Sequence, residues 1–163
     1  MISGKILAAF AAFTASLTGT AKVAKAANHG TPFLDRGWYP SLVKSAGKYK
    51  IPVTVALSQV KQESGGNERA LGSAGEIGLL QLKQSVLTDY VRITHDTARN
   101  LYSPVDNIEI GLWYLSWLRD HYKITLSEAL LAYNSGIGNF LKGHIQNPRY
   151  SLDIIERAST YAV

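Results

Sequence analysis

The sequence predicts an all-α fold with at most a minor β ribbon near residues 72–78. Apolar residues recur at helical spacing along several segments, and proline, glycine or capping residues bracket most of these segments. No segment alternates convincingly at the period of two that a half-buried strand would show. The 163 residues, 46% hydrophobic and 18% charged, suffice for one globular domain.

Residues 1–27 are interpreted as a secretory signal peptide. Lys5 precedes a short apolar run, and Ala24-Lys25-Ala26 offers a small-residue cleavage site. Because the run is too short to span a bilayer comfortably, no stable membrane anchor is expected after cleavage. The competing interpretation is an uncleaved N-terminal anchor. We therefore expect an exported protein, periplasmic or extracellular.

The composition excludes several function classes. The formal charge is +5, but three lysines and no acids lie within residues 1–27, so the remainder carries 14 basic against 12 acidic residues. A nucleic-acid partner is therefore not indicated. The absence of cysteine excludes disulfides, thiolate metal sites and a cysteine nucleophile. His95-Asp96 lacks a second histidine at i+3 or i+4, so we interpret it as surface and predict no metal site.

The first half of the domain is expected to contain two helices and a glycine-rich loop. Residues 28–37 should be a flexible lead-in to a domain over residues 38–163. A first helix should run from residue 40 to 49, with Leu42, Val43 and Ala46 on its buried side. A second should start at Pro52 and bury its own apolar stripe of Val53, Ala56, Leu57 and Val60.

The glycines at 72, 75 and 78 predict a loop or ribbon, which should feed a helix from Leu79 to about Tyr90 and then an irregular connection. The most apolar helix should run from Pro104 to about His121. Its aromatic stripe could line a sugar groove, but core packing is the commoner meaning. Gly111 inside it is tolerable if another helix crosses closely there.

The last third is expected to hold three helices. Thr125-Leu-Ser-Glu128 is a capping-box pattern and begins a helix that ends at Asn134-Ser-Gly136. A short helix to Gln146 should follow. Pro148 then introduces the last helix, whose expected buried residues are Leu152, Ile155, Ala158 and Tyr161.

Glu63 stands out because it extends the apolar stripe of the second helix beyond Val60. Burying a carboxylate is costly, and desolvation raises its pKa toward the range useful for a proton donor at neutral pH. The alternative is a side chain that turns to solvent as the helix ends before Gly65. The helix alone leaves both interpretations open.

Four short blocks follow one another in order. They are Glu63-Ser64-Gly65, Gly75-Glu-Ile-Gly78-Leu-Leu-Gln81, Asn107-Ile-x-x-Gly111 and Ala132-Tyr133-Asn134-Ser-Gly136. In order and spacing they resemble the lytic transglycosylases of the soluble, goose-lysozyme-like type. The resemblance runs from about Trp38 to Tyr161 and implies a lysozyme-like fold.

The resemblance also implies roles for individual residues. Glu63 corresponds to the single catalytic acid/base, and Ser64 to a neighbour that hydrogen-bonds near the substrate or the acid. Gln81 corresponds to a glutamine of the cleft. Tyr133 and Asn134 correspond to the aromatic–amide pair beside the carboxylate and the sugar. Asn107 and Gly111 match positions that look structural.

The implied reaction cleaves peptidoglycan between N-acetylmuramic acid and N-acetylglucosamine and leaves 1,6-anhydromuramoyl ends, without metal or cofactor. Glu76 stands where many members have a small residue. A side chain entering the cleft could act as a second carboxylate and favour water as nucleophile, but an exposed loop position is the preferred interpretation. A lysozyme-type hydrolase therefore stays a close alternative.

A non-catalytic glycan-binding or assembly protein is the alternative from another class. The retained Glu63, Tyr133 and Asn134 argue against it, because a binder needs no proton donor. We expect a monomer that acts on peptidoglycan strands. By analogy, a small enzyme of this kind would open the wall locally for a secretion system, a conjugation apparatus, a pilus or a phage.

Overall fold

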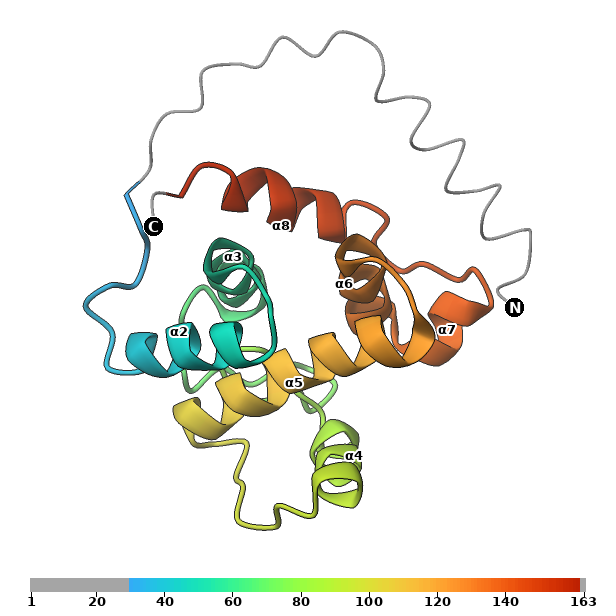
Figure 1. Ribbon diagram of the computed structural model, residues 1–163, viewed down its shortest axis with the longest axis horizontal. Helices are drawn as coiled ribbons and strands as arrows, with labels where there is room; N and C mark the ends of the chain where they lie inside the picture. The colour runs from blue at the N-terminus through green and yellow to red at the C-terminus, as the bar shows by residue number, and fades with distance from the viewer. Residues whose placement is uncertain (1–29, 162–163) are drawn as a thin grey trace, which may run out of the picture.

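A computed structural model describes residues 30–161, which form helices joined by loops around one central helix (Figure 1). The signal peptide predicted over residues 1–27 lies outside this range. The helices are α2 (Tyr39–Lys48), α3 (Val53–Ser64), α4 (Gln84–Thr94), α5 (Pro104–Tyr122), α6 (Leu126–Ser135), α7 (Ile137–Leu141) and α8 (Tyr150–Ala158). The only β pairing among the described residues consists of two isolated bridges, Leu71–Ile77 and Ile77–Leu82. The all-α prediction with a minor ribbon is confirmed.

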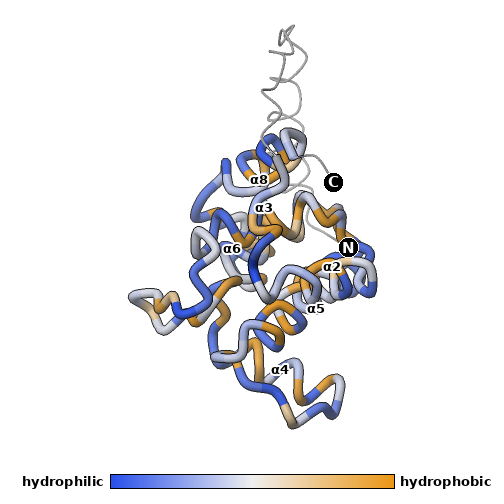
Figure 2. Tube along the Cα trace, turned by 90° about the vertical axis from the view of Figure 1, so that its left-hand side faces the viewer, coloured by the Kyte–Doolittle hydropathy of each residue, from blue (hydrophilic) through white to orange (hydrophobic). Residues whose placement is uncertain are grey.

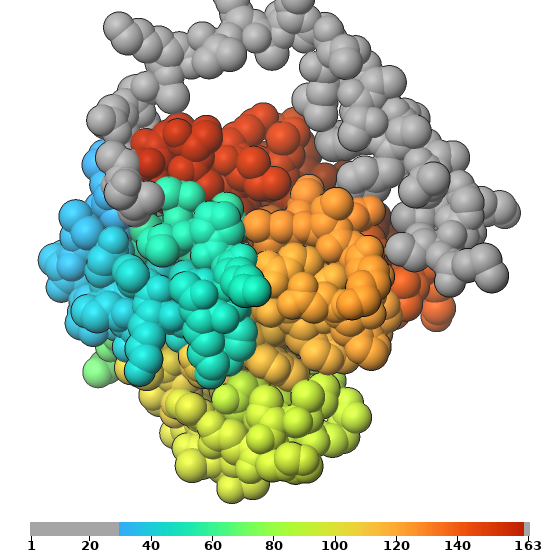
Figure 3. Space-filling model, viewed as in Figure 1, coloured from blue at the N-terminus to red at the C-terminus, as the bar shows by residue number. Residues whose placement is uncertain are grey.

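Helix α5 is the centre of the molecule. It packs against α2, α6 and α4, while α8 packs against α3 and α6. Figure 1 and Figure 3 show α8 at one end of the molecule and α4 at the opposite end. Figure 2 places many of the most hydrophobic residues on α5 and on the helices around it. Nine residues of α5 are buried, so this helix mainly builds the core; of its aromatic stripe Trp113 is buried, whereas Tyr114 and Trp117 are half-buried.

Local signals set the ends of the helices that carry the site. Pro52 precedes α3, which ends where Gly65 adopts the left-handed conformation (φ 62°). Both halves of the predicted capping box form at the start of α6, between Thr125 and Glu128. Ser103 caps α5 by accepting a hydrogen bond from the Asp106 N–H. Glu63 consequently stands in the last turn of α3, beside the loop that leaves it.

The prediction of a helix that starts at Leu79 is wrong. Leu79, Leu80 and Gln81 lie in a turn, and α4 begins only at Gln84. The Leu80 N–H donates to the Asn107 side chain at 2.8 Å, and Ile77 and Leu82 exchange backbone hydrogen bonds. These long-range bonds use the backbone groups that a helix would need. At the other end α4 continues past Tyr90 to Thr94, and later α7 stops at Leu141, well before Gln146.

Two helices bury a slightly different face from the expected one. Val43 is 38% exposed and Ile155 is 39% exposed, while Ser45 and Ile154 are buried. Each correction moves the buried stripe by one or two residues, a shift that periodicity resolves poorly on a short helix. Gly111 does make room, but for the side chain of Leu80 from the loop and not for a crossing helix.

The lead-in contacts the domain in the part that the structure describes. Residues 32–38 form turns, and the ring of Phe33 lies against Gly66 with its centroid 5.3 Å from that of the Trp38 ring. A Cβ atom at Gly66 would collide with that ring. The segment therefore covers the backbone directly after the Glu63 end of α3.

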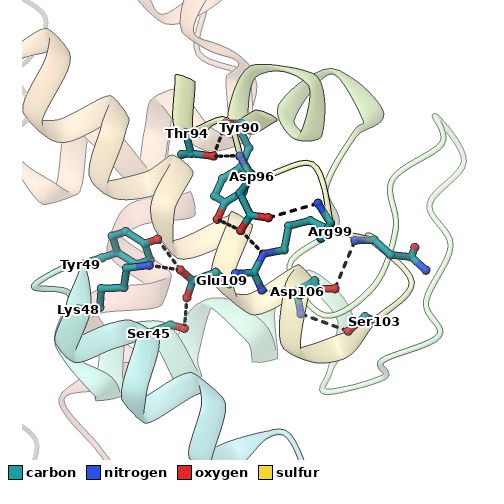
Figure 4. A network of polar contacts seen from close by, with 12 residues as sticks. Ser45, Lys48, Tyr49, Tyr90, Thr94, Asp96, Arg99, Ser103, Asp106 and Glu109 are labelled. Carbon is teal, nitrogen blue, oxygen red and sulfur yellow. Dashed lines mark hydrogen bonds and ion pairs between the residues drawn. The ribbon is translucent and has the colours of Figure 1, made fainter. Parts of the chain in front are cut away.

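A polar network fastens α5 to its surroundings (Figure 4). Buried Glu109 accepts hydrogen bonds from the hydroxyls of Ser45 and Tyr49, each at 2.6 Å, and pairs with Lys48. Arg99 bridges Asp96 and Asp106 at 2.7 Å each, which ties the connection after α4 to the start of α5. Buried charge is tolerated here because it is paired and hydrogen-bonded.

Candidate active site

A cleft of about 470 Å³ opens where α3, α5, α6 and the loop after α3 meet. Every block singled out in the sequence except Asn107–Gly111 contributes a side chain to it. Its lining residues are Glu63, Glu76, Gln81, Leu82, Lys83, Ser85, Val86, Tyr114, Tyr133, Asn134, Ser135, Gly136, Asn139 and Gln146. The cleft thus unites residues that lie far apart in the chain.

Glu63 is partly buried at the C-terminal end of α3, and its carboxyl borders the cleft. The pKa of Glu63 is raised to about 7. Burial is the largest cause and raises the pKa, the hydrogen bond from Tyr150 lowers it, and the negative charge of Glu76 raises it slightly. Desolvation is therefore the dominant cause. At neutral pH such a carboxyl is present both as acid and as carboxylate, as a group that first donates and then accepts a proton requires.

The hydroxyl of Tyr150 donates a hydrogen bond to Glu63 Oε1. This tyrosine is the first residue of α8 and is only 2% exposed. Burial raises its pKa well above the usual value, so the phenol keeps its proton and acts as a donor. Sequence reasoning missed Tyr150. The available signal was a tyrosine just after Pro148 at a helix start, since a buried tyrosine hydroxyl usually has a partner.

Tyr133 forms a wall of the cleft. Its hydroxyl donates to the Leu80 carbonyl at 2.8 Å, which joins α6 to the loop after α3. Burial, with Glu63 and Tyr114 nearby, holds its pKa well above the usual value. Its ring centroid lies 5.5 Å from that of Tyr114. The hydroxyl is thus occupied by the backbone, and Tyr133 lines the cleft together with Glu63.

Asn134 lines the cleft one residue later in α6. Its Oδ1 is buried and has no hydrogen-bond partner within residues 30–161. An unpaired buried acceptor is costly, and such groups call for an explanation. An acceptor that borders a cleft is suited to a ligand N–H or O–H.

Gln81 lines the cleft from a strained backbone position. Its φ of 45° is in the left-handed region, which a non-glycine residue adopts only where its surroundings impose it. The side-chain amide donates to the carbonyls of Gly78 at 2.9 Å and Ala70 at 3.3 Å. These bonds fix the side chain against its own loop.

Ser64 lies next to Glu63 but is not among the residues that line the cleft. Its hydroxyl donates to the Leu79 carbonyl at 2.9 Å and accepts from the Gly66 N–H at 3.2 Å. It therefore clamps the end of α3 to the loop that carries Gln81.

The side chain of Asn107, near the start of α5, holds the loop between α3 and α4. Its Oδ1 accepts from the Leu80 N–H, and its amide donates to the carbonyls of Ile77 at 2.8 Å and Leu101 at 3.0 Å. Its side chain is completely buried and fills the space where Gly78 has no Cβ. Two of these three bonds go to the loop and thus set its path past the cleft.

Glu76 corrects an expectation. Its side chain is 23% exposed and lines the cleft, although an exposed loop position was preferred. It pairs with Lys83 at 3.2 Å and accepts a hydrogen bond from the Ala74 N–H at 3.0 Å. Hydrogen bonding from its own backbone is the main cause that holds its pKa below the usual value, with Lys83 contributing. Glu76 is therefore ionised at neutral pH.

Within residues 30–161, no group of three or more histidine, aspartate or glutamate side chains is placed to hold a metal ion. His95 is exposed, and Asp96 is engaged by Arg99 and Tyr90. Over the same range, none of the helices combines the length and apolarity of a bilayer span.

A family model described as "Transglycosylase SLT domain" matches residues 41–153. Membrane-bound lytic murein transglycosylase E of Buchnera aphidicola subsp. Acyrthosiphon pisum is 30% identical over 131 residues, covering 74% of this chain and 59% of that protein. Membrane-bound lytic murein transglycosylase C of Histophilus somni (strain 2336) is 31% identical over 128 residues, which cover 71% of this chain and 35% of that protein. The chain thus spans less than two thirds of either relative.

Solved structures agree on the fold. The 70 kDa soluble lytic transglycosylase of Escherichia coli superposes with a TM-score of 0.65 at 20% identity, over 74% of this chain and 23% of that one. An inactive glutamate-to-glutamine mutant of the lytic transglycosylase Slt from Pseudomonas aeruginosa superposes with a TM-score of 0.64 at 21% identity. The match covers 78% of this chain and 24% of that one. The lysozyme-like architecture is confirmed.

Proposed function

Since this chain belongs to the transglycosylase SLT domain family, we propose that it is a lytic transglycosylase of peptidoglycan. It cleaves the β-1,4 bond between N-acetylmuramic acid and N-acetylglucosamine, with Glu63 as the single acid/base. The observation that carries this proposal is a carboxyl with a pKa of about 7 that borders a cleft. The names of the two relatives described above, both membrane-bound lytic murein transglycosylases, support the substrate class.

In the first step, protonated Glu63 donates its proton to the glycosidic oxygen and the bond to the anomeric carbon breaks. The oxocarbenium-like centre that develops is stabilised by the N-acetyl group of the substrate, a known exception to the two-carboxylate pattern. Tyr150 stabilises the new Glu63 carboxylate by donating a hydrogen bond to it.

In the second step, the Glu63 carboxylate takes the proton of the 6-hydroxyl of the same sugar. The hydroxyl oxygen attacks the anomeric carbon, which closes the 1,6-anhydro ring. Glu63 ends protonated, so one residue completes the cycle and no water is consumed. The intermediate pKa of Glu63 serves both steps about equally well.

The remaining site residues position the sugar. The free Oδ1 of Asn134 accepts a hydrogen bond from a substrate amide or hydroxyl, and the ring of Tyr133 packs against a sugar face. Gln81 lines the same cleft. Ser64 positions Glu63 indirectly: its hydroxyl donates to the Leu79 carbonyl and so fixes the end of α3 against the loop.

A lysozyme-type hydrolase is the second candidate, because Glu76 lines the cleft. A second carboxylate opposite Glu63 would activate water. Its ion pair with Lys83 and its bond to the Ala74 N–H argue against this role, because they occupy the carboxylate and lower its basicity. Glu76→Gln should leave the ratio of anhydro to reducing ends unchanged in a peptidoglycan digest. A drop in reducing ends would favour the hydrolase.

Replacement of Glu63 by glutamine tests the assignment. Glu63→Gln should lose at least about 10³-fold in turnover of purified peptidoglycan while keeping its helical circular dichroism, since the proton donor is gone. Near-wild-type turnover by this variant contradicts the proposal. Glycan binding by the wild type without turnover would instead support a non-catalytic binding protein.

The setting follows from the substrate. Peptidoglycan lies outside the cytoplasm, so the proposal includes export directed by residues 1–27 and action as a monomer on glycan strands. Local opening of the wall for a secretion, conjugation or pilus apparatus is the proposed use.

A further inference from the structure

A row of aromatic side chains leads out of the cleft along α5. Tyr114, Trp117 and His121 follow one another at spacings of three and four residues, so they share one face of this helix. Tyr114 lines the cleft, and its ring centroid lies 5.5 Å from that of Tyr133. The ring of Trp117 follows at 6.2 Å and that of His121 at a further 4.8 Å, with interplanar angles of 14° and 13°. The row therefore runs from the cleft toward the C-terminal end of α5.

A shallow surface pocket of about 590 Å³ lies at the far end of this row. Its lining residues are Trp113, Ser116, Trp117, Asp120, His121 and Lys123, all from α5 and the residue that follows it. The pocket thus combines aromatic rings with a hydroxyl, a carboxylate and an ammonium group. Ligand pockets are typically built from apolar and aromatic side chains with a few polar groups among them.

Core packing accounts for Trp113 but not for Trp117. Trp113 is only 8% exposed, and its ring packs edge-on against that of Tyr90 at 5.0 Å. Trp117 is half-buried and its stacking partner His121 is exposed. Leucine suffices to seal the core on this helix, as at the completely buried Leu118. A partly accessible tryptophan beside a pocket is instead typical of a binding surface.

A sugar ring suits this combination of side chains. A pyranose has apolar C–H groups on its faces, which pack against aromatic rings, and hydroxyls around its edge, which need hydrogen-bonding partners. Sugar hydroxyls can accept from Lys123 and donate to Asp120, whose charge Arg119 already balances at 2.8 Å. The proposed substrate is a polymer of such rings, so it continues beyond the cleft that holds the bond to be cleaved. The row that starts at Tyr114 joins that cleft to the pocket.

We propose that the pocket at Trp117 and His121 is an outer glycan subsite. It binds a sugar residue of the strand that Glu63 cleaves, away from the reacting bond. This inference rests on the proposed function. Because only a long strand reaches both the cleft and the pocket, the subsite favours long strands over short ones.

The test compares the binding of long and short strands. Glycan strands stripped of peptides by an amidase are sorted into tetrasaccharides and long strands, and each is titrated calorimetrically into Glu63→Gln protein, where turnover does not interfere. Trp117→Leu, added to that protein, keeps apolar bulk against the core and removes the aromatic ring. Its affinity for long strands should fall about tenfold, whereas its affinity for tetrasaccharides should change less than about twofold.

Three further variants serve as controls. Trp117→Tyr keeps a ring and should retain the affinity for long strands to within about threefold. His121→Ala alters an exposed residue, so it folds even where Trp117→Leu does not, and should weaken the binding of long strands about threefold. Tyr102→Leu removes a ring that is 68% exposed before the other end of α5 and should change neither affinity.

Tryptophan fluorescence locates the bound strand. The chain has three tryptophans, of which Trp38 and Trp113 are 3% and 8% exposed, so quenching by iodide reports chiefly on Trp117. Long strands should reduce this quenching, and tetrasaccharides should not. Equal quenching with and without long strands would contradict the proposal.

The titrations can also overturn it. An equal loss of affinity for long and short strands would mean that Trp117 acts on the cleft through Tyr114. Unchanged affinity in both Trp117→Leu and His121→Ala would leave the pocket no part in binding. A loss seen only with strands that carry their peptides would assign the pocket to the peptide.

These outcomes are separate from the failure of the proposed function. A wild-type protein that releases no muropeptides would refute the proposed function. The titrations need no turnover, so they would still decide whether the pocket binds glycan.

Discussion

Glu63 makes opposite contributions to folding and to the proposed chemistry. Its pKa in the fold is about 7, above the usual value of 4.5. The unfolded chain therefore releases this proton at a lower pH than the folded chain does. Between these two pH values, and above them, ionisation favours the unfolded state. The burial that makes Glu63 a proton donor at neutral pH therefore lowers the stability of the fold.

Glu63→Gln should accordingly stabilise the protein at high pH. The free energy of unfolding at pH 8 should rise by about 2–3 kcal/mol, because a neutral amide replaces a carboxylate that resists burial. The gain should vanish at pH 4, where the carboxyl is protonated in both states. Urea unfolding at the two pH values measures it, with Glu68→Gln as a control on an exposed glutamate near the same helix end. Equal stability of Glu63→Gln and wild type at pH 8 would show that burial does not raise this pKa.

Tyr150→Phe should move the pH profile to higher pH. It removes the hydrogen bond that lowers the pKa of Glu63, so the pKa should rise by about one to two pH units and the alkaline limb should move up with it. Turnover at pH 7 should fall about tenfold, because the carboxylate formed in the first step loses its donor. Measured pH–rate profiles decide this. An alkaline limb that stays in place would remove Tyr150 from the mechanism.

At the scale of elements, the loop between α3 and α4 decides the shape of the cleft. It carries Glu76 and Gln81 and receives bonds from three separate helices, through Ser64 of α3, Asn107 of α5 and Tyr133 of α6. The loop is thus held by side chains from outside itself. Its conformation depends on the packing of these helices.

Asn107→Ala should test this dependence. It removes the partner of the buried Leu80 N–H and of the Leu101 carbonyl, so the free energy of unfolding should fall by about 2–3 kcal/mol. Turnover should fall as well under conditions where the variant is fully folded, because Gln81 is no longer held in place. Thermal unfolding and a turnover assay at low temperature measure the two effects.

Asn107→Asp is the matched control for this change. It keeps the acceptor for Leu80 but puts a buried carboxylate against the Ile77 and Leu101 carbonyls, so at neutral pH it should be at least as destabilising as Asn107→Ala. A folded Asn107→Ala variant with full activity would show that the loop keeps its path without this amide.

At the scale of the whole molecule, Glu109 joins the central helix α5 to α2. Burial raises its pKa, but hydrogen bonds from Lys48, Ser45 and Tyr49 outweigh this and hold the pKa below the usual value. A carboxyl of this kind stabilises the fold above its unfolded pKa. The stabilisation is lost as pH falls through the folded pKa.

Glu109→Gln should therefore destabilise the protein at pH 7 and make acid unfolding less steep. The loss at pH 7 should be about 2–3 kcal/mol, since Lys48 and two hydroxyls lose a charged acceptor. The difference from wild type should shrink below about pH 4. Urea unfolding against pH measures it, with Glu156→Gln as an exposed control. A difference that stays constant with pH would mean that Glu109 acts only by packing.

The predictable parts of the fold are those set by nearby residues. Gly65 ends α3, and the capping box of Thr125 and Glu128 begins α6. Both boundaries were predicted from a few adjacent residues. The turn at Leu79–Gln81 was predicted wrongly as helix, because its hydrogen bonds come from residue 107. The buried faces of α2 and α8 were offset, since neighbouring helices decide which side of a short helix is covered.

The same division holds for the site. The cleft brings together Glu63, Gln81, Tyr133 and Asn134, which the resemblance had singled out. Tyr150 was missed because it is 87 residues from Glu63: the tyrosine after Pro148 marks a helix start, but nothing near it in the sequence indicates which group its hydroxyl contacts. The burial of Gln59 could not be predicted either, because a glutamine on a helix usually faces solvent.

The products released from purified peptidoglycan test the central claim most directly. Wild-type protein and the Glu63→Gln variant are incubated with sacculi, and the soluble muropeptides are separated and weighed by mass spectrometry. The account predicts 1,6-anhydromuramoyl products, each one water lighter than its reducing counterpart, from the wild type and almost none from the variant. Products with reducing ends from the wild type, or anhydro products at a similar rate from the variant, would contradict it.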